Sequence, residues 1–145
     1  MTKNLDIEGL SSIVDSYQLF YVDLWGVVHN GVSLHDKAIK TLKEITKKGK
    51  DYVLLTNAPR PNHAVQSFLE KLGMEKEIRD HVFTSGEAAL IYLKKNLIDK
   101  TFFHVGPPRD FDLFKDFEKM KLNNIDKSDY ILCTGLFDDH NEDLK

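Results

Sequence analysis

The chain has 145 residues, of which 41% are hydrophobic and 30% charged, a balance that predicts one globular domain around a single core. A net charge of -3 gives no basic footprint and argues against nucleic acid and anionic membranes as partners. The lone cysteine, Cys133, excludes an intrachain disulfide, and its apolar run "YILCTG" predicts a small core residue rather than a nucleophile. With neither a signal peptide nor a membrane-length apolar stretch, we expect a cytoplasmic protein.

Apolar runs alternate with segments of helical spacing along the chain. The runs predict strands at 18–23, 51–57, 81–86, 101–106 and 129–135, the first of them buried. Helical spacing predicts helices over 35–49, 63–73, 87–97 and 109–120. This alternation favours an α/β fold, and we expect a Rossmann-like three-layer sandwich with a mainly parallel sheet.

Polar residues follow three of these strands. Right-handed crossovers place the carboxyl ends of parallel strands at one edge of the sheet, where such folds bind ligands. We therefore expect Asp23, Thr56–Asn57 and 84–86 to converge there. Asp23 could act as a nucleophile on phosphorus, as a metal ligand or as a structural cap, and Gly26 lets the chain turn closely around a ligand.

The other two strand ends also have alternative interpretations. Thr56 and Asn57 could hold a phosphoryl oxygen or could simply begin a turn before Pro59. Arg60 could attract an anionic substrate or remain a solvated surface residue. In "TSGEAAL", residue 84 or 85 is expected to N-cap the following helix, with a glutamate near the capping-box position, and that helix N-terminus would also favour an anion.

The histidines and the C-terminal acids predict no metal centre of their own. The six histidines show no zinc-ligand spacing, and His29 alone is near the predicted site. The acidic cluster at 138–143 lacks calcium-loop spacing and is better explained as an acidic first helical turn. The charged segment 94–100 predicts a boundary, giving domains 1–97 and 98–145.

The three strand ends together resemble the haloacid dehalogenase-like hydrolases, and more narrowly their class IIA phosphatases, which carry a large cap after the second motif. The segments "FYVDLWGVVHNG", "YVLLTNAPR" and "VFTSGEAAL" carry the resemblance within residues 18–97. "TFFHVGPPRDFD" and "SDYILCTGLFDD" are similar to the first two strand segments of that cap. The resemblance implies an incomplete core over 1–97 and the beginning of an α/β cap over 98–145.

The resemblance also implies a mechanism. Asp23 would attack a phosphomonoester to form an aspartyl-phosphate that water then hydrolyses, and Mg²⁺ would bind the Asp23 carboxylate and the Trp25 carbonyl. Thr56, Asn57 and Gly26 would bind the phosphate. Arg60 and His29 would contact the substrate, which we expect to be a small phosphorylated metabolite. The expected partners include neither nucleic acid nor membrane.

Two departures from the family pattern limit this reading. Trp25 occupies the position of the aspartate that protonates the leaving alcohol, a function worth ~10²–10⁴-fold, with His29 as a conceivable replacement. The later lysine and acidic motifs are missing, so we expect an N-terminal fragment whose hydrolysis is impaired. The alternative is a non-catalytic phosphate-binding or assembly module that forms a homo-oligomer through an exposed sheet edge. A flavodoxin-like or receiver-type domain fits less well, because "DLWGV" lacks an acidic pair.

Overall fold

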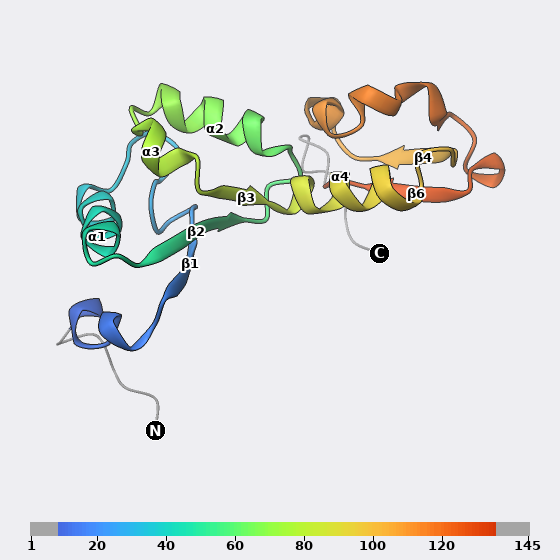
Figure 1. The fold of residues 1–145 in the computed structure, drawn as a ribbon. Helices are drawn as coiled ribbons and strands as arrows, with labels where there is room; N and C mark the ends of the chain where they lie inside the picture. Colours follow the sequence, from blue (N-terminus) through green and yellow to red (C-terminus); the bar gives the residue numbers. More distant parts are fainter. Residues whose placement is uncertain (1–8, 136–145) are drawn as a thin grey trace, which may run out of the picture. The chain divides into compact units, whose positions relative to one another are not determined.

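The computed structural model describes residues 9–135, and the strands and helices alternate as expected for an α/β fold (Figure 1). The strands are β1 (Leu19–Asp23), β2 (Asp51–Thr56), β3 (Val82–Thr84), β4 (Phe102–Val105), β5 (Lys121–Leu122) and β6 (Tyr130–Cys133). The α-helices are α1 (Asp36–Lys47), α2 (Asn62–Lys71), α3 (Lys76–Arg79) and α4 (Ser85–Asn96). Two compact units are present, one up to Thr56 with Phe68–Phe83, the other Asn57–Ser67 with the residues from Thr84 onward.

The first unit contains a three-stranded sheet in the order β1-β2-β3. β1 and β2 are parallel, with Tyr21 opposite Val53 and Asp23 opposite Leu55, and β3 runs in the same direction as β2 in Figure 1. Asp23 is the last residue of β1 and Thr56 is the last residue of β2. Because Asp23 is opposite Leu55, the two strands end within one residue of each other. The expected alignment of these two strand ends at one edge is confirmed.

Helix α1 follows from its sequence. Asp36 lies in its first turn and Lys47 in its last, which complements the helix dipole. Leu42 and Ile45 are buried on one face, and Gly49 after the helix has a positive φ of 67°, a conformation that glycine adopts without steric cost. The helix predicted from this pattern is confirmed.

Strand β1 is less buried than its apolar sequence predicts. Its exposure alternates along the strand, and Leu19 and Tyr21 are 43% and 68% exposed. An uninterrupted apolar run is typical of a strand covered on both faces. In the described part of the chain one face of β1 is open to solvent, so the prediction of a buried strand is wrong. Asp23 is exposed for the same reason, so its carboxylate stays solvated and needs no partner to offset a cost of desolvation.

The second unit contains the parallel sheet β5-β4-β6 and its own apolar core. Phe102 is fully buried, and the rings of Phe114 and Phe117 pack edge-on against it at centroid distances of 5.4 and 5.7 Å. The α-helix predicted over 109–120 is wrong, because two 3₁₀-helices, Pro108–Leu113 and Lys115–Met120, occupy this segment. The chain breaks from helical geometry at Phe114, between the two 3₁₀-helices, and the Phe111 ring packs edge-on against Phe114 at 5.3 Å.

Cys133 is exposed, so the prediction of a core cysteine is wrong. The sheet order makes β6 an edge strand, and its burial alternates so that Leu132 is buried while Cys133 is not. The acidic cluster at 138–143 lies outside the described residues. Across the residues described, no helix has the length and apolar character to cross a membrane.

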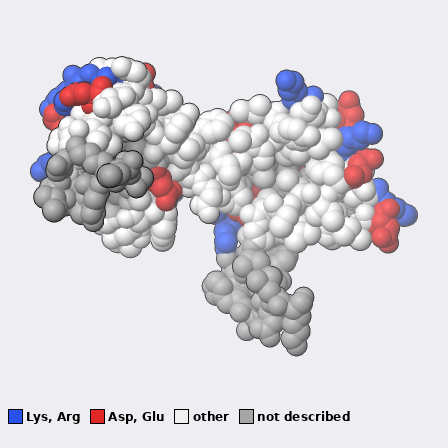
Figure 2. All heavy atoms as spheres, turned by 90° about the horizontal axis from the view of Figure 1, so that it is seen from below, with Lys and Arg blue, Asp and Glu red and all other residues white. Residues whose placement is uncertain are grey.

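Charged side chains of opposite sign lie close to one another at the surface. Figure 2 shows acidic and basic side chains next to one another on the face in view. Many are paired, as in the exposed contacts Lys43–Glu75 and Lys47–Glu44 at 2.6 and 2.5 Å. Exposed pairs of this kind contribute little stability, about 0–1 kcal/mol each.

Candidate functional site

The loop after β1 wraps around a single carbonyl. The Leu24 oxygen accepts hydrogen bonds from the backbone N–H groups of Val28 and His29 at 2.9 and 3.2 Å. The side chains of Leu24 and Val28 are buried and anchor the loop from below. Gly26 has a positive φ of 76° and donates its N–H to the His29 carbonyl at 2.8 Å, so the turn requires its conformational freedom.

Asp23 stands at the start of this loop with an exposed carboxylate. Its Oδ1 accepts a hydrogen bond from the Leu24 N–H at 2.8 Å, which fixes the orientation of the carboxylate. Thr56, at the end of the paired strand, is half-buried. The first unit thus presents an oriented carboxylate and a threonine at the ends of neighbouring parallel strands, an arrangement suited to a phosphoryl group.

Trp25 and His29 pack against one another beside Asp23. The Trp25 ring is 65% exposed and meets the His29 ring edge-on at 5.5 Å, and a Cβ atom at Gly31 would lie 2.7 Å from it. His29 also contacts the Phe68 ring at 5.6 Å. The Trp25 side chain is therefore directed against its own loop and offers no ionisable group.

His29 is 5% exposed and its Nδ1 accepts a hydrogen bond from the Gly31 N–H at 3.0 Å. Burial, with a contribution from His35, lowers the pKa of His29 below its ordinary value, and the Asp23 charge partly opposes this. A ring that accepts at Nδ1 and has a lowered pKa is the neutral imidazole protonated at Nε2. Its predicted contact with substrate stays a prediction.

In the second unit the N-terminus of α4 holds the loop that follows β2. Ser85 Oγ and the Gly86 N–H both donate to the Ala58 carbonyl, at 3.0 and 3.1 Å. Thr84 Oγ1 donates to the Arg60 carbonyl and accepts from the Glu87 N–H at 2.8 Å, as an N-cap residue does. The predicted N-cap is confirmed. The backbone N–H groups of Gly86 and Glu87, in the first turn of α4, both donate to other groups of the protein.

The capping box expected from Glu87 is divided between two helices. Glu87 Oε2 accepts from the backbone N–H of Asn62, the first residue of α2, at 2.9 Å. The Thr84 N–H donates instead to Asn62 Oδ1 at 2.9 Å. In a local capping box the Glu87 side chain would accept from the Thr84 N–H. Here the Asn62 side chain accepts from this N–H instead. Sequence reasoning missed Asn62, because its partners lie more than twenty residues away in the chain.

Gly86 allows this close approach. A Cβ atom at Gly86 would lie 2.3 Å from the Arg60 nitrogen and 2.5 Å from the Arg60 oxygen, both backbone atoms. The glycine therefore lets α4 contact the loop that begins at Asn57. That contact sets the position of Asn57 and Arg60 within this unit.

Arg60 is half-exposed and faces a buried acid. Its Nε lies 3.6 Å from Asp110 Oδ1, and the Asp110 side chain is only 4% exposed. A buried carboxylate is costly without an opposite charge, and the Arg60 guanidinium provides that charge for Asp110. The guanidinium that was expected to attract a substrate is therefore paired within the protein. Asp110, which lies in the segment predicted to be helical, was not identified from the sequence.

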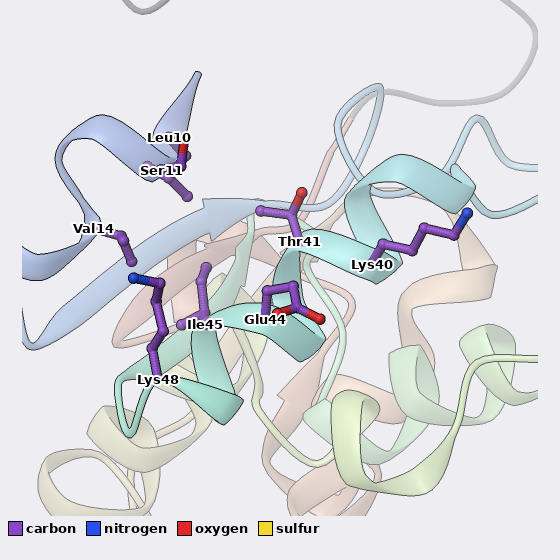
Figure 3. Close-up of a pocket in the computed structure, with 8 residues that line it drawn as sticks. All are labelled: Leu10, Ser11, Val14, Lys40, Thr41, Glu44, Ile45 and Lys48. Carbon is purple, nitrogen blue, oxygen red and sulfur yellow. The ribbon is translucent and has the colours of Figure 1, made fainter. Parts of the chain in front are cut away.

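Two cavities are relevant to the position of a ligand. One, of about 270 Å³, lies in the second unit and is lined by Asn57, Pro59, Ser85, Gly86, Ala89, Leu113, Leu132, Cys133 and Thr134. The other, of about 340 Å³, lies in the first unit between the turns at 10–16 and α1 (Figure 3). Figure 3 shows Leu10, Val14 and Ile45 around it, with Lys48 at its rim. Only the first cavity contains a predicted site residue, Asn57.

The loop after β1 offers oxygen ligands for part of a divalent cation site. Within residues 9–135 no group of three or more His, Cys, Asp or Glu side chains is placed to hold a metal ion. Mg²⁺ is commonly held by one or two carboxylates, with substrate phosphate and water completing its shell. The exposed Asp23 carboxylate and the adjacent Trp25 carbonyl are oxygen ligands that fit part of such a site.

Comparison with known proteins gives consistent matches. A family described as haloacid dehalogenase-like hydrolase matches residues 20–119. Phosphoglycolate phosphatase 2 of Arabidopsis thaliana is 32% identical over 105 residues, which are 70% of this chain and 35% of that protein. The structure of a haloacid dehalogenase-like hydrolase from Brucella suis superposes with a TM-score of 0.78 at 31% identity, over 92% of this chain and 50% of that one.

A further structure shares the fold at lower identity. It is a glycerol phosphate phosphatase from Mycobacterium tuberculosis in complex with calcium, with a TM-score of 0.61 and 21% identity, over 86% of this chain and 37% of that one. The chain spans half or less of the length of each of these relatives.

Proposed function

The chain belongs to the haloacid dehalogenase-like hydrolases, as the three motifs predicted, and from this premise we propose that it hydrolyses phosphate monoesters with Asp23 as the nucleophile. The observation that carries the proposal is the exposed Asp23 carboxylate, oriented by the Leu24 N–H at 2.8 Å beside the strand that ends at Thr56. The relatives named as phosphatases support the same activity.

The proposed reaction has two steps. An oxygen of the Asp23 carboxylate forms a bond to phosphorus while the bond from phosphorus to the alcohol oxygen breaks, and the alcohol leaves with a proton from solvent. Water then attacks the aspartyl-phosphate, which releases inorganic phosphate and restores the carboxylate. Thr56 and the Asn57 N–H orient the phosphoryl oxygens, because phosphoryl transfer depends mainly on positioning and electrostatics.

We further propose a Mg²⁺ ion held by the Asp23 carboxylate and the Trp25 carbonyl. Such an ion would neutralise charge on the phosphoryl oxygens. The exposed Asp23 carboxylate and its place in the same loop as Trp25 support this assignment. Removal of Mg²⁺ with a chelator is expected to abolish turnover and addition of Mg²⁺ to restore it, whereas turnover that persists with chelator would contradict the assignment.

Trp25 limits the proposed activity. An indole neither protonates a leaving alcohol nor accepts a proton from water, and general acid-base catalysis contributes ~10²–10⁴-fold. His29 is a poor substitute, because it is buried and its Nδ1 is occupied by Gly31. We therefore propose slow turnover, with aryl phosphates hydrolysed better than alkyl phosphates because a phenolate leaves without a proton.

The proposal is tested by hydrolysis of p-nitrophenyl phosphate with Mg²⁺. We expect slow release of p-nitrophenolate that Asp23→Asn abolishes. Asp51→Asn is the matched control, because Asp51 is also an exposed strand aspartate but lies at the opposite end of β2. Equal rates for wild type and Asp23→Asn would contradict the proposal, and loss of activity in both variants would point to a general charge effect.

We propose a small phosphorylated metabolite as the substrate, in a reducing cytoplasmic compartment and with neither nucleic acid nor membrane as a partner. The net charge of -3 and the single cysteine support the choice of partners and compartment. The small phosphate esters in the names of the relatives support the choice of substrate.

A second candidate is assembly through β1. Among the described residues β1 lies at the edge of its sheet and exposes Leu19 and Tyr21, and it carries neither Lys nor Pro to discourage pairing. Light scattering coupled to size exclusion tests this candidate. Assembly predicts a dimer that Tyr21→Lys dissociates, and a monomer at every concentration would contradict it.

A further inference from the structure

Trp25 is a large apolar side chain that the loop after β1 leaves in solvent. Its exposed fraction is 65%, whereas Leu24 and Val28 in the same loop are buried. Tryptophan is on average a well-buried residue, because removal of its ring from water is strongly favourable. Most of the Trp25 surface is not buried by the described residues, so it is available to a ligand.

Contacts within the loop hold the Trp25 ring in place. The His29 ring meets it edge-on at 5.5 Å with an interplanar angle of 87°. A Cβ atom at Gly31 would lie 2.7 Å from the indole, so the absence of a side chain there makes room for the ring. His29 is itself fixed by the Phe68 ring at 5.6 Å and by the Gly31 N–H. A ring held in this way loses little conformational entropy when a ligand stacks on it.

The ring also lies within reach of a phosphoryl group on Asp23. Only Leu24 separates Trp25 from Asp23 in the chain, and two residues span at most about 7 Å. The Asp23 charge acts on His29, against which the indole packs, and partly opposes the lowering of the His29 pKa by burial. Asp23, Trp25 and His29 all belong to the first compact unit, so their arrangement is a property of that unit alone.

The indole restricts the chemistry of a ligand at this surface. It carries no charge, and its Nε1–H is its single hydrogen-bond donor. Its π surface attracts another aromatic ring in an offset-stacked or edge-to-face arrangement, which adds to binding beyond the area buried. A carboxylate or a polyol gains less, because it loses water here without a matching charge or a set of hydrogen-bond partners.

We propose that Trp25 determines substrate specificity by stacking on an aromatic ring in the organic portion of the substrate, so that the site selects phosphate esters that carry such a ring close to the phosphate. The inference rests on the proposed function, because it places the phosphoryl group on Asp23. It adds a preference in binding to the preference for aryl leaving groups. The two preferences are separable, because stacking requires no bond to break.

Two phosphonates isolate the preference in binding. Benzylphosphonate and cyclohexylmethylphosphonate contain the same number of carbon atoms and a P–C bond that the proposed reaction does not cleave, and they differ in the aromaticity of the ring. Isothermal titration calorimetry of the whole chain with Mg²⁺ measures the Kd of each. The contribution of an aromatic pair beyond area burial corresponds to a factor of about 2–10 in Kd, so we expect benzylphosphonate to bind more tightly by this factor.

Variants of the loop assign the preference to one side chain. Trp25→Leu should bind the two phosphonates equally, and Trp25→Phe, which keeps an aromatic ring, should retain part of the preference. The matched control is Val32→Ala, which shortens another exposed apolar side chain of the same loop and should leave the preference unchanged. Trp25 is the sole tryptophan, so its fluorescence in wild type should change with benzylphosphonate and give the same Kd as calorimetry.

Several results would overturn the inference. These are equal Kd values in wild type, absence of binding by both phosphonates, and a preference that survives Trp25→Leu. Fluorescence that depends on protein concentration rather than on either phosphonate would assign the ring to a protein contact and would also overturn it. Each of these results leaves the proposed function intact if p-nitrophenyl phosphate hydrolysis still requires Asp23. Hydrolysis that does not require Asp23 would refute the proposed function and the inference with it.

Discussion

Substitution of Gly86 by alanine tests the packing that positions Asn57. The new Cβ would lie 2.3 Å from the Arg60 nitrogen, about 1 Å short of ordinary contact, so the loop must retreat. Retreat strains the hydrogen bonds from Ser85 and Gly86 to the Ala58 carbonyl and from Thr84 to the Arg60 carbonyl. If two of these three hydrogen bonds are lost, the free energy of unfolding falls by about 2 kcal/mol. Overpacking lowers it by about 1–3 kcal/mol more.

The higher helix propensity of alanine opposes this loss by about 1 kcal/mol. The net destabilisation is therefore at least about 2 kcal/mol, which lowers Tm by roughly 4–8 °C for a chain of this size. Urea denaturation followed by circular dichroism measures the free energy of unfolding. The control Ser85→Ala removes one hydrogen bond without a steric conflict and should cost about 1 kcal/mol. A Gly86→Ala protein as stable as wild type, as helix propensity alone predicts, would refute the reasoning.

Two other predictions concern the loop after β1. Trp25→Asp is expected to raise the first-turnover rate of phosphorylation by an alkyl phosphate by up to ~10²-fold, and that by p-nitrophenyl phosphate by less, because in this step only the alkoxide needs a proton. Equal gains in this step for both substrates would argue against the general-acid explanation. Burial lowers the pKa of His29, so this side chain binds a proton more readily in the unfolded chain than in the folded one. Its contribution to the free energy of unfolding is therefore complete above about pH 6.5 and is lost as the pH falls below that value. His29→Asn keeps an acceptor for the Gly31 N–H but does not titrate, so its urea midpoint should vary less than that of wild type between neutral and acidic pH. If the urea midpoints of the two proteins change with pH to the same extent, His29 is not the group responsible.

The sequence predicted the elements whose signals are local. The apolar run ending at Asp23, the helix from Asp36 with its glycine stop, and the Thr84 cap all depend on neighbours within a few residues. These elements were predicted correctly because strand periodicity, helix charge and capping act at short range. The edge alignment of Asp23 with Thr56 followed from the topology of parallel strands.

The features that were missed depend on distant partners. Nothing near Tyr21 in the sequence indicates that one face of β1 is open to solvent in the described residues. The pairing of Asn62 with Thr84 and Glu87, and of Arg60 with Asp110, joins segments far apart in the chain. The 3₁₀-helices after Pro107 replace the predicted α-helix, because the backbone leaves helical geometry at Phe114 and again at Phe117.

Detection of the covalent intermediate tests the central claim most directly. With p-nitrophenyl phosphate the first step needs no proton donor, whereas hydrolysis of the aspartyl-phosphate lacks a base at Trp25, so the intermediate should accumulate. Acid-quenched samples analysed by peptide mass spectrometry should show one phosphoryl group on Asp23 in wild type and none in Asp23→Asn. Release of p-nitrophenolate without a phosphoryl group on Asp23, or with the group on another residue, would contradict the account.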